Sequence, residues 1–145
     1  MLKGISPIVS PELLKIMQEM GHGDEICIGD GNFPAANYAQ RLVRLDGHGV
    51  PDILGAMMPL FPLDSFVAKP VFLMDPGNPD VPKPPIWEDY ERIIKQYEPG
   101  FSDFEYVERF AFYEQAKKAY AIIATGEAAL YANVILKKGV IEPGS

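Results

Sequence analysis

The chain has 145 residues, a formal net charge of −7, 48% hydrophobic residues and 23% charged residues. A chain of this length forms one ordinary domain with its own apolar core, and the composition argues against disorder. The acidic balance argues against nucleic acid and anionic membranes as partners, because both require clustered Lys and Arg, and it weakly favours a neutral or cationic small ligand.

Cys27 is the single cysteine, so no intrachain disulfide can form, as is usual in a reducing compartment. It lies in the apolar run Ile26-Cys27-Ile28, which favours a packed, inert thiol over a reactive one. The first residues lack the apolar segment of a signal peptide, and no stretch approaches the ~20 apolar residues that span a bilayer. We therefore expect a cytoplasmic protein.

The first predicted helix begins at Ser10-Pro11-Glu12, where serine can cap, proline suits the first turn and glutamate complements the helix dipole. An apolar stripe follows at helical spacing, and Gly21 ends the helix. In chain order, the later patterns predict a strand over 25–29, a turn over 31–34, a strand over 41–46, a helix over 50–60, a strand over 66–74, a helix over 86–97, a strand over 105–108, a helix over 110–118 and strands over 119–124 and 133–136.

This alternation of strands and helices predicts an α/β domain over residues 1–145. Residues 75–85 are rich in Pro and Gly, but they are few and lie between strong patterns, so we interpret them as a surface loop within that domain. Residues 142–145 are expected to form a flexible tail.

His22 is the first candidate for chemistry. It lies between two glycines, after a helix and before a strand, and histidine exchanges a proton near neutral pH. The pattern also fits an ordinary turn histidine. His48 has a similar glycine setting without a carboxylate at a neighbouring strand end, which favours a turn role.

Asp30 follows the predicted strand 25–29, and ligands of open α/β sheets gather beyond the carboxyl ends of strands. Its carboxylate can accept hydrogen bonds from sugar hydroxyls, although an aspartate of a turn gives the same pattern. His22, Asp24 and Asp30 match no familiar metal-ligand spacing, and the neighbouring glycines form no nucleotide-binding motif. We therefore expect no metal.

Arg109, Tyr131 and Asn133 lie late in the chain and are residue types that commonly surround sugars. Taken alone, each of these residues fits a surface or packing role better than a role in a site.

Several motifs in order resemble one family across nearly the whole chain. Residues 1–7, 10–15 and 19–26, which include Gly21-His22-Gly23-Asp24, resemble the opening of the L-fucose mutarotase family, a relative of D-ribose pyranase. The later motifs are Arg109-Phe110-Ala111-Phe112-Tyr113-Glu114, the segment 121–127 and the segment 131–140, which begins Tyr131-Ala132-Asn133.

The resemblance implies a three-layer α/β/α fold with a mixed sheet, and a ring-shaped homodecamer with sites near subunit contacts. It implies an isomerase that interconverts the anomers of a free monosaccharide. By motif position, His22 matches the general acid, and the matched substrate-binding residues are Asp30, Arg109, Tyr131, Ala132 and Asn133. Anomer exchange passes through the open-chain aldehyde by proton transfer, so we expect no cofactor.

Two departures leave the sugar open. Fucose-type members often carry a histidine where this chain has Asn32, and Ala132 replaces a glycine found in some of them. L-fucose or a related sugar is the expected substrate. The alternatives are a D-ribose-type pyranase, a sugar-binding or regulatory module without turnover, and a purely structural ring-forming protein.

Overall fold

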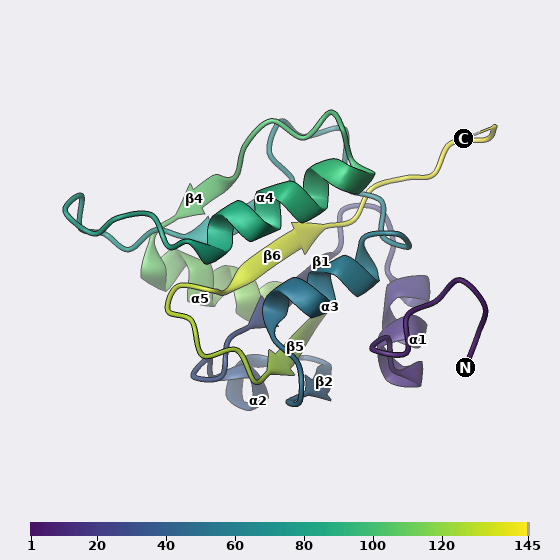
Figure 1. Ribbon diagram of the computed structural model, residues 1–145, viewed down its shortest axis with the longest axis horizontal. Helices are drawn as coiled ribbons and strands as arrows, with labels where there is room; N and C mark the ends of the chain where they lie inside the picture. Colours follow the sequence, from purple (N-terminus) through teal and green to yellow (C-terminus); the bar gives the residue numbers. More distant parts are fainter. Residues whose placement is uncertain (145) are drawn as a thin grey trace.

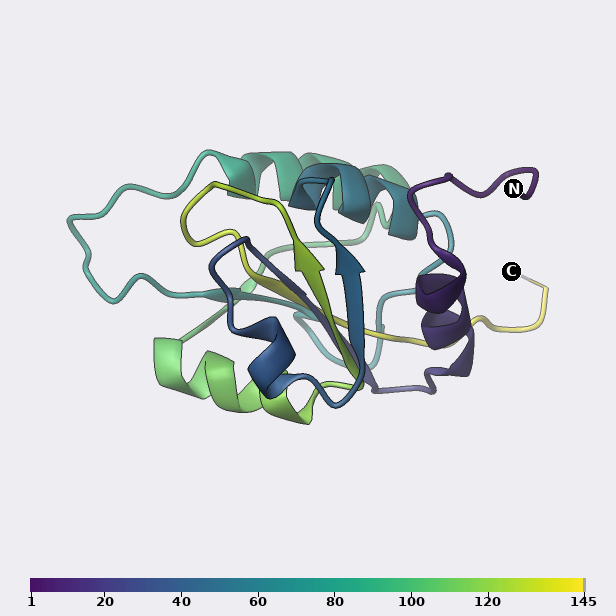
Figure 2. The ribbon, with the colours of Figure 1, turned by 90° about the horizontal axis from the view of Figure 1, so that it is seen from below.

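The strands form a mixed six-stranded sheet in the order β2-β5-β1-β6-β3-β4. In the computed structural model, which describes residues 1–144, helices cover both faces of this sheet (Figures 1 and 2). This arrangement confirms the predicted three-layer α/β/α fold. The elements are α1 (Pro11–Glu19), β1 (Glu25–Gly29), α2 (Ala35–Tyr38), β2 (Leu42–Leu45), α3 (Val50–Met57), β3 (Val71–Met74), α4 (Ile86–Tyr97), β4 (Glu105–Val107), α5 (Arg109–Lys118), β5 (Ala121–Thr125) and β6 (Val134–Lys137).

Strand direction places the ends of most strands at one edge. β5 is parallel to both β1 and β2, and β3 is parallel to β4, whereas β6 runs antiparallel to β1 and β3. β1 to β5 therefore all end at the same edge of the sheet, which we call the carboxyl edge, and β6 begins there. The segments that follow β1, β3 and β4 and the segment that precedes β6 consequently meet at this edge.

Side chains alternate between two apolar cores, as the period of two along a strand requires. On β1, Ile26 and Ile28 join the core beneath α1, α3 and α4, whereas Cys27 joins the smaller core beneath α2 and α5. Cys27 is fully buried, in agreement with the predicted packed thiol. The central strands β1, β5 and β6 are thus buried by apolar contacts on both faces.

Most predicted elements are confirmed within one to three residues, and those over 25–29 and 86–97 have the predicted bounds. Ser10 caps α1 by accepting from the Leu13 amide at 3.2 Å. One strand prediction is too long: 66–74 is a strand only over Val71–Met74. Phe66 and Val67 are exposed, and Pro70, which has no N–H, precedes the paired segment. The single-turn helix α2 was not predicted.

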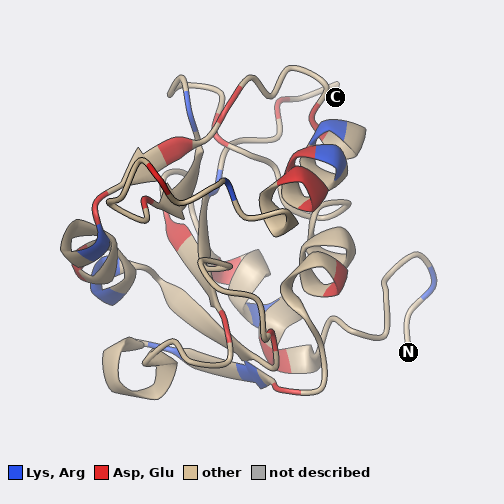
Figure 3. Cartoon of the chain, turned by 60° about the vertical axis from the view of Figure 1, so that its left-hand side comes forward, with Lys and Arg blue, Asp and Glu red and all other residues tan. Residues whose placement is uncertain are grey.

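Charged residues of both signs are spread over the elements (Figure 3). On α4, Arg92 pairs with Asp89 at 3.0 Å and Lys95 with Glu91 at 2.6 Å. Exposed pairs of this kind each contribute about 0–1 kcal/mol, so the apolar cores carry most of the stability.

Among the helices of residues 1–144, none has the length and apolar character needed to cross a bilayer. The predicted flexible tail 142–145 includes Ser145, which lies outside the described residues.

Candidate active site

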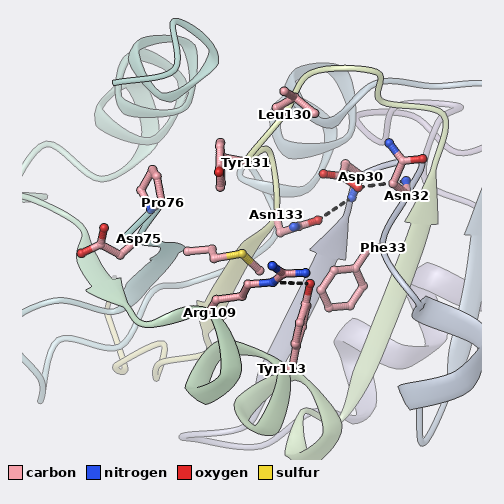
Figure 4. A pocket seen from close by; sticks show the side chains of 11 residues that line it. Asp30, Asn32, Phe33, Asp75, Pro76, Arg109, Tyr113, Leu130, Tyr131 and Asn133 are labelled. Carbon is pink, nitrogen blue, oxygen red and sulfur yellow. Dashed lines mark hydrogen bonds between the residues drawn. The ribbon is translucent and has the colours of Figure 1, made fainter. Parts of the chain in front are cut away.

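A cavity of about 300 Å³ opens at the carboxyl edge of the sheet (Figure 4). This volume is at the small end of ligand pockets and suits a ligand of monosaccharide size. The lining comes from the segments after β1, β3 and β4, from α5, and from the segment before β6: Asp30, Asn32, Phe33, Met74, Asp75, Pro76, Arg109, Tyr113, Leu130, Tyr131 and Asn133.

Two hydrogen bonds position Asp30 in the lining of this pocket. Its amide donates to Oδ1 of Asn133 at 2.8 Å, and its own Oδ1 accepts from the Asn32 amide at 2.9 Å. Asp30 and Asn133 are 9% and 6% exposed. Burial raises the pKa of the Asp30 carboxyl above its ordinary value, although backbone hydrogen bonds from Asn32, Phe33 and Ala132 oppose the shift. The site therefore presents a fixed, poorly solvated carboxyl group.

Arg109 provides the positive charge of the pocket. It is the first residue of α5, directly after β4, and its Nε donates to the Tyr113 hydroxyl one turn later at 3.3 Å. The ring of Phe33 lies 5.8 Å from that of Tyr113, so an aromatic surface adjoins the guanidinium (Figure 4). The pocket thus combines hydrogen-bond donors, acceptors and flat apolar surface, which is the combination that a sugar ring requires.

The segment before β6 contributes differently at each of its three residues. Tyr131 lines the pocket with φ of 55°, in the left-handed region that non-glycine residues rarely adopt. Asn133 lines it through its amide side chain. Ala132 is fully buried in the larger core and is not part of the lining, so its side chain cannot contact a ligand there.

His22 lies at the opposite edge of the sheet. It precedes β1, and a five-residue strand is about 17 Å long. The adjoining Gly23 adopts φ of 86°, and its amide donates to the Lys138 carbonyl just beyond β6. His22 borders a separate, more apolar groove of about 440 Å³ between α1 and residues 138–141. The structure thus brings Asp30, Arg109, Tyr131 and Asn133 together and leaves His22 outside their pocket.

Asp64 is the partner of His22, 42 residues away in sequence. Its Oδ1 lies 3.0 Å from Nε2 of His22 and also accepts from the Phe66 amide at 3.0 Å. Burial alone would raise the pKa of Asp64, but hydrogen bonds from Phe66 and His22 hold it below its ordinary value. The Asp64 side chain is 4% exposed and that of His22 is 48% exposed. A buried carboxylate therefore fixes one ring nitrogen of His22 and leaves half of the imidazole accessible.

Sequence reasoning missed Asp64, Asp75 and Tyr113. Asp75 directly follows a buried strand, as Asp30 does, so the rule that identified Asp30 applies to it as well. Tyr113 lies one helical turn after Arg109, which is a spacing that brings side chains together. Asp64 follows no predicted strand or helix, and no local signal marks it. Within residues 1–144, no three His, Cys, Asp or Glu side chains are grouped as metal ligands would be.

Comparisons with known proteins identify the family of this chain. The model of the RbsD / FucU transport protein family matches residues 3–141. The chain belongs to this family. An L-fucose mutarotase from Actinobacillus pleuropneumoniae serotype 5b (strain L20) is 46% identical over 140 residues, which cover 97% of each chain.

Solved structures of family members have the same fold. The fucose mutarotase from Streptococcus pneumoniae, in complex with L-fucose, superposes with a TM-score of 0.88 at 46% identity, covering 97% of this chain and all of that one. RbsD from Bacillus subtilis, in complex with D-ribose, superposes with a TM-score of 0.74 at 23% identity, covering 98% and 100%. The second likeness shows the fold alone.

Proposed function

We propose that this protein is a monosaccharide mutarotase that interconverts the α and β anomers of L-fucose without a cofactor. The observation that carries the proposal is the pocket at the carboxyl edge, where Asp30, Arg109 and Asn133 converge in a space of monosaccharide size. The Streptococcus pneumoniae relative, which was solved with L-fucose, supports this choice of sugar.

The reaction needs proton transfer and no redox step. In ring opening, the ring oxygen gains a proton while the anomeric hydroxyl loses one, and the bond between C1 and the ring oxygen breaks to give the aldehyde. In closure, the hydroxyl adds to the other face of the aldehyde. Asp30 and Asn133 would hold sugar hydroxyls, Arg109 would donate to them, and Tyr131 would cover the ring. We assign the proton donor to His22, because it matches the general acid by motif position and histidine exchanges a proton near neutral pH. Positioned acids of this kind accelerate such steps about 10²–10⁴-fold.

This assignment requires two copies of the chain, because His22 lies across the sheet from the pocket. An exposed apolar side chain lies beside His22, and another lies beside the pocket. The ring centroid of Phe66, which is 69% exposed, lies 5.1 Å from that of His22, and Leu130, which is 70% exposed, lines the pocket. We propose that one copy places His22 over the pocket of the next, burying these side chains. Because the two surfaces differ, the contact would be head-to-tail. Such contacts form a ring where the rotation between copies closes, and the resemblance implies a ring of ten copies.

The buried single thiol, which is typical of a reducing compartment, leads us to propose the cytoplasm as the site of action. Fractionation of the source cells followed by immunodetection tests this location. Recovery with membranes or outside the cell would contradict it.

The proposed activity is tested by saturation-transfer NMR of anomer exchange, with L-fucose and D-ribose in parallel. We expect the protein to accelerate exchange of L-fucose more than interconversion of the D-ribose forms. Faster D-ribose interconversion would favour the pyranase alternative. Binding of a sugar by calorimetry without acceleration would favour a non-catalytic sugar-binding module.

Asp64 should act on the reaction through His22. In Asp64→Asn the shape is kept, but the carboxylate that orients the imidazole is lost, and we expect kcat to fall about tenfold with little change in KM, since Asp64 does not line the sugar pocket. Asp46→Asn, at an exposed aspartate paired with Arg44, is the matched control. A change confined to KM would contradict this role.

A further inference from the structure

The strained backbone of Tyr131 has two unusual anchors. Its carbonyl accepts from Nε1 of Trp87 at 2.8 Å, and the carbonyl of the next residue, Ala132, accepts from the Tyr90 hydroxyl at 2.6 Å. Both donors come from the first turns of α4, 42 to 44 residues away in sequence. Two consecutive carbonyls are therefore fixed from one helix, at the point where the chain adopts φ of 55°.

The anchors are buried and lie outside the pocket. Tyr90 is 0% exposed and Trp87 is 5% exposed, and neither belongs to the pocket lining. Burial raises the pKa of Tyr90, and the nearby charges of Glu127 and Asp30 raise it further, so its hydroxyl keeps the hydrogen that it donates to Ala132. Trp87 is also positioned from its other side, since its ring packs 5.6 Å from that of Tyr106 on β4.

The anchored segment forms a large part of the pocket wall. Tyr131 covers one side of the cavity, and Asn133, two residues on, accepts from the Asp30 amide at 2.8 Å (Figure 4). The backbone of Ala132 also lowers the pKa of the Asp30 carboxyl. A shift at residues 131 and 132 would therefore move the Tyr131 ring and disturb Asp30 together. A left-handed tyrosine persists only where the surrounding structure over-determines it, and here the surroundings are the two α4 donors.

We propose that Trp87 and Tyr90 are positioning residues for sugar recognition, which hold Tyr131 in its left-handed conformation and thereby set the shape of the pocket. This inference rests on the proposed function, because it assigns the same pocket to the sugar. It gives α4 a role beyond packing, since its amino-terminal turns support the site without contacting the ligand.

The test compares Tyr90→Phe, which removes one hydroxyl, with Tyr97→Phe, which removes the hydroxyl of an exposed tyrosine on the same helix. Binding of L-fucose is measured by the fluorescence of Trp87, the single tryptophan of the chain, and by calorimetry. We expect Tyr90→Phe to weaken binding about tenfold and to raise KM to match, because small displacements within a site are costly. Tyr97→Phe should bind as the wild type does.

A purely structural role would lower the melting temperature and leave affinity well below that temperature unchanged. A double-mutant cycle of Tyr90 and Tyr131 separates the structural role from the positioning role further. If Tyr90 acts through Tyr131, the loss of affinity caused by Tyr90→Phe should shrink to about twofold or less in a Tyr131→Ala background, because contacting residues couple and independent ones add. Trp87→Phe, which keeps a ring but loses the donor, gives a second variant measured by calorimetry should Tyr90→Phe fail to fold.

The outcomes also separate this inference from the proposed function. Unchanged sugar affinity in both α4 variants, or an equal loss with and without Tyr131, overturns the inference even if the wild type is a mutarotase. A wild type that binds L-fucose without accelerating exchange contradicts the proposed function, while the affinities of the variants still decide the inference. If neither L-fucose nor D-ribose binds, both fail.

Discussion

His22→Ala is expected to slow catalysed anomer exchange of L-fucose by about 10²–10⁴-fold while leaving the fold intact, because a positioned general acid contributes about that factor. The His22 side chain is half exposed, and its hydrogen bond goes to a carboxylate that the Phe66 amide still satisfies after the change. We therefore expect the loss in kcat and near-normal thermal unfolding. Saturation-transfer NMR of L-fucose measures the rate, and unchanged exchange would remove His22 from the mechanism.

Mixing two impaired variants tests whether His22 acts on the pocket of another copy. His22→Ala keeps an intact pocket, and Asp30→Asn keeps an intact imidazole at the other edge. If the protein is unfolded and refolded as an equal mixture, about a quarter of the sites in mixed rings combine a wild-type pocket with a wild-type His22. At an L-fucose concentration far below the KM of Asp30→Asn, we expect about a quarter of wild-type activity to return. No recovery in rings shown by native mass spectrometry to be mixed would contradict the two-copy site.

Asp30→Asn is expected to raise KM for L-fucose about 10- to 100-fold, because hydrogen bonds to a charged group are worth about 1.5–3 kcal/mol. Asp30 lines the pocket and is 9% exposed, so hydrogen bonds from its carboxylate to a sugar would be shielded from water. Asp46→Asn, which changes the net charge equally at an exposed site, is the control. Equal KM values in the two variants would show that Asp30 does not hold the substrate.

Asp30 should also give the reaction an acid limb. Burial raises the pKa of its carboxyl above the ordinary 3.8, so in the free enzyme it accepts a proton at a higher pH than an exposed aspartate does. As pH falls through this raised pKa, kcat/KM for L-fucose should decline, and the decline should be absent in Asp30→Asn. A pH profile of both proteins checks this expectation.

The same raised pKa affects stability in the opposite direction. Because the pKa of Asp30 is higher in the folded state, the folded protein binds this proton more tightly than the unfolded chain does. The stabilisation is complete below the unfolded-state pKa of Asp30, and it is lost as pH rises through the folded-state pKa. At neutral pH the ionised carboxylate thus opposes folding. Asp30→Asn should therefore unfold at or above the wild-type temperature at pH 7, which separates its loss of affinity from loss of structure.

Most of the local structure follows from residues that are close together in the sequence, because capping, turn chemistry and apolar periodicity act within a few residues. Ser10 and Pro11 marked the start of α1, and the bounds of β1 and α4 followed from their patterns. Asp30 was expected at a ligand-binding edge because it follows a buried strand, and the pocket lies there. The local rule failed over 66–70, where apolar side chains extend towards solvent without a neighbouring strand to pair with.

Which residues share a site depends instead on how distant segments of the chain pack together. Strand order is set by contacts between distant segments, and a single reversed strand, β6, brings Asn133 to the carboxyl edge and Lys138 to the edge that holds His22. The pairing of His22 with Asp64 spans 42 residues, and the anchoring of Tyr131 by Trp87 spans 44. Local periodicity does not predict such pairings, because they form only when the apolar faces pack and bring polar groups from distant segments within hydrogen-bonding distance.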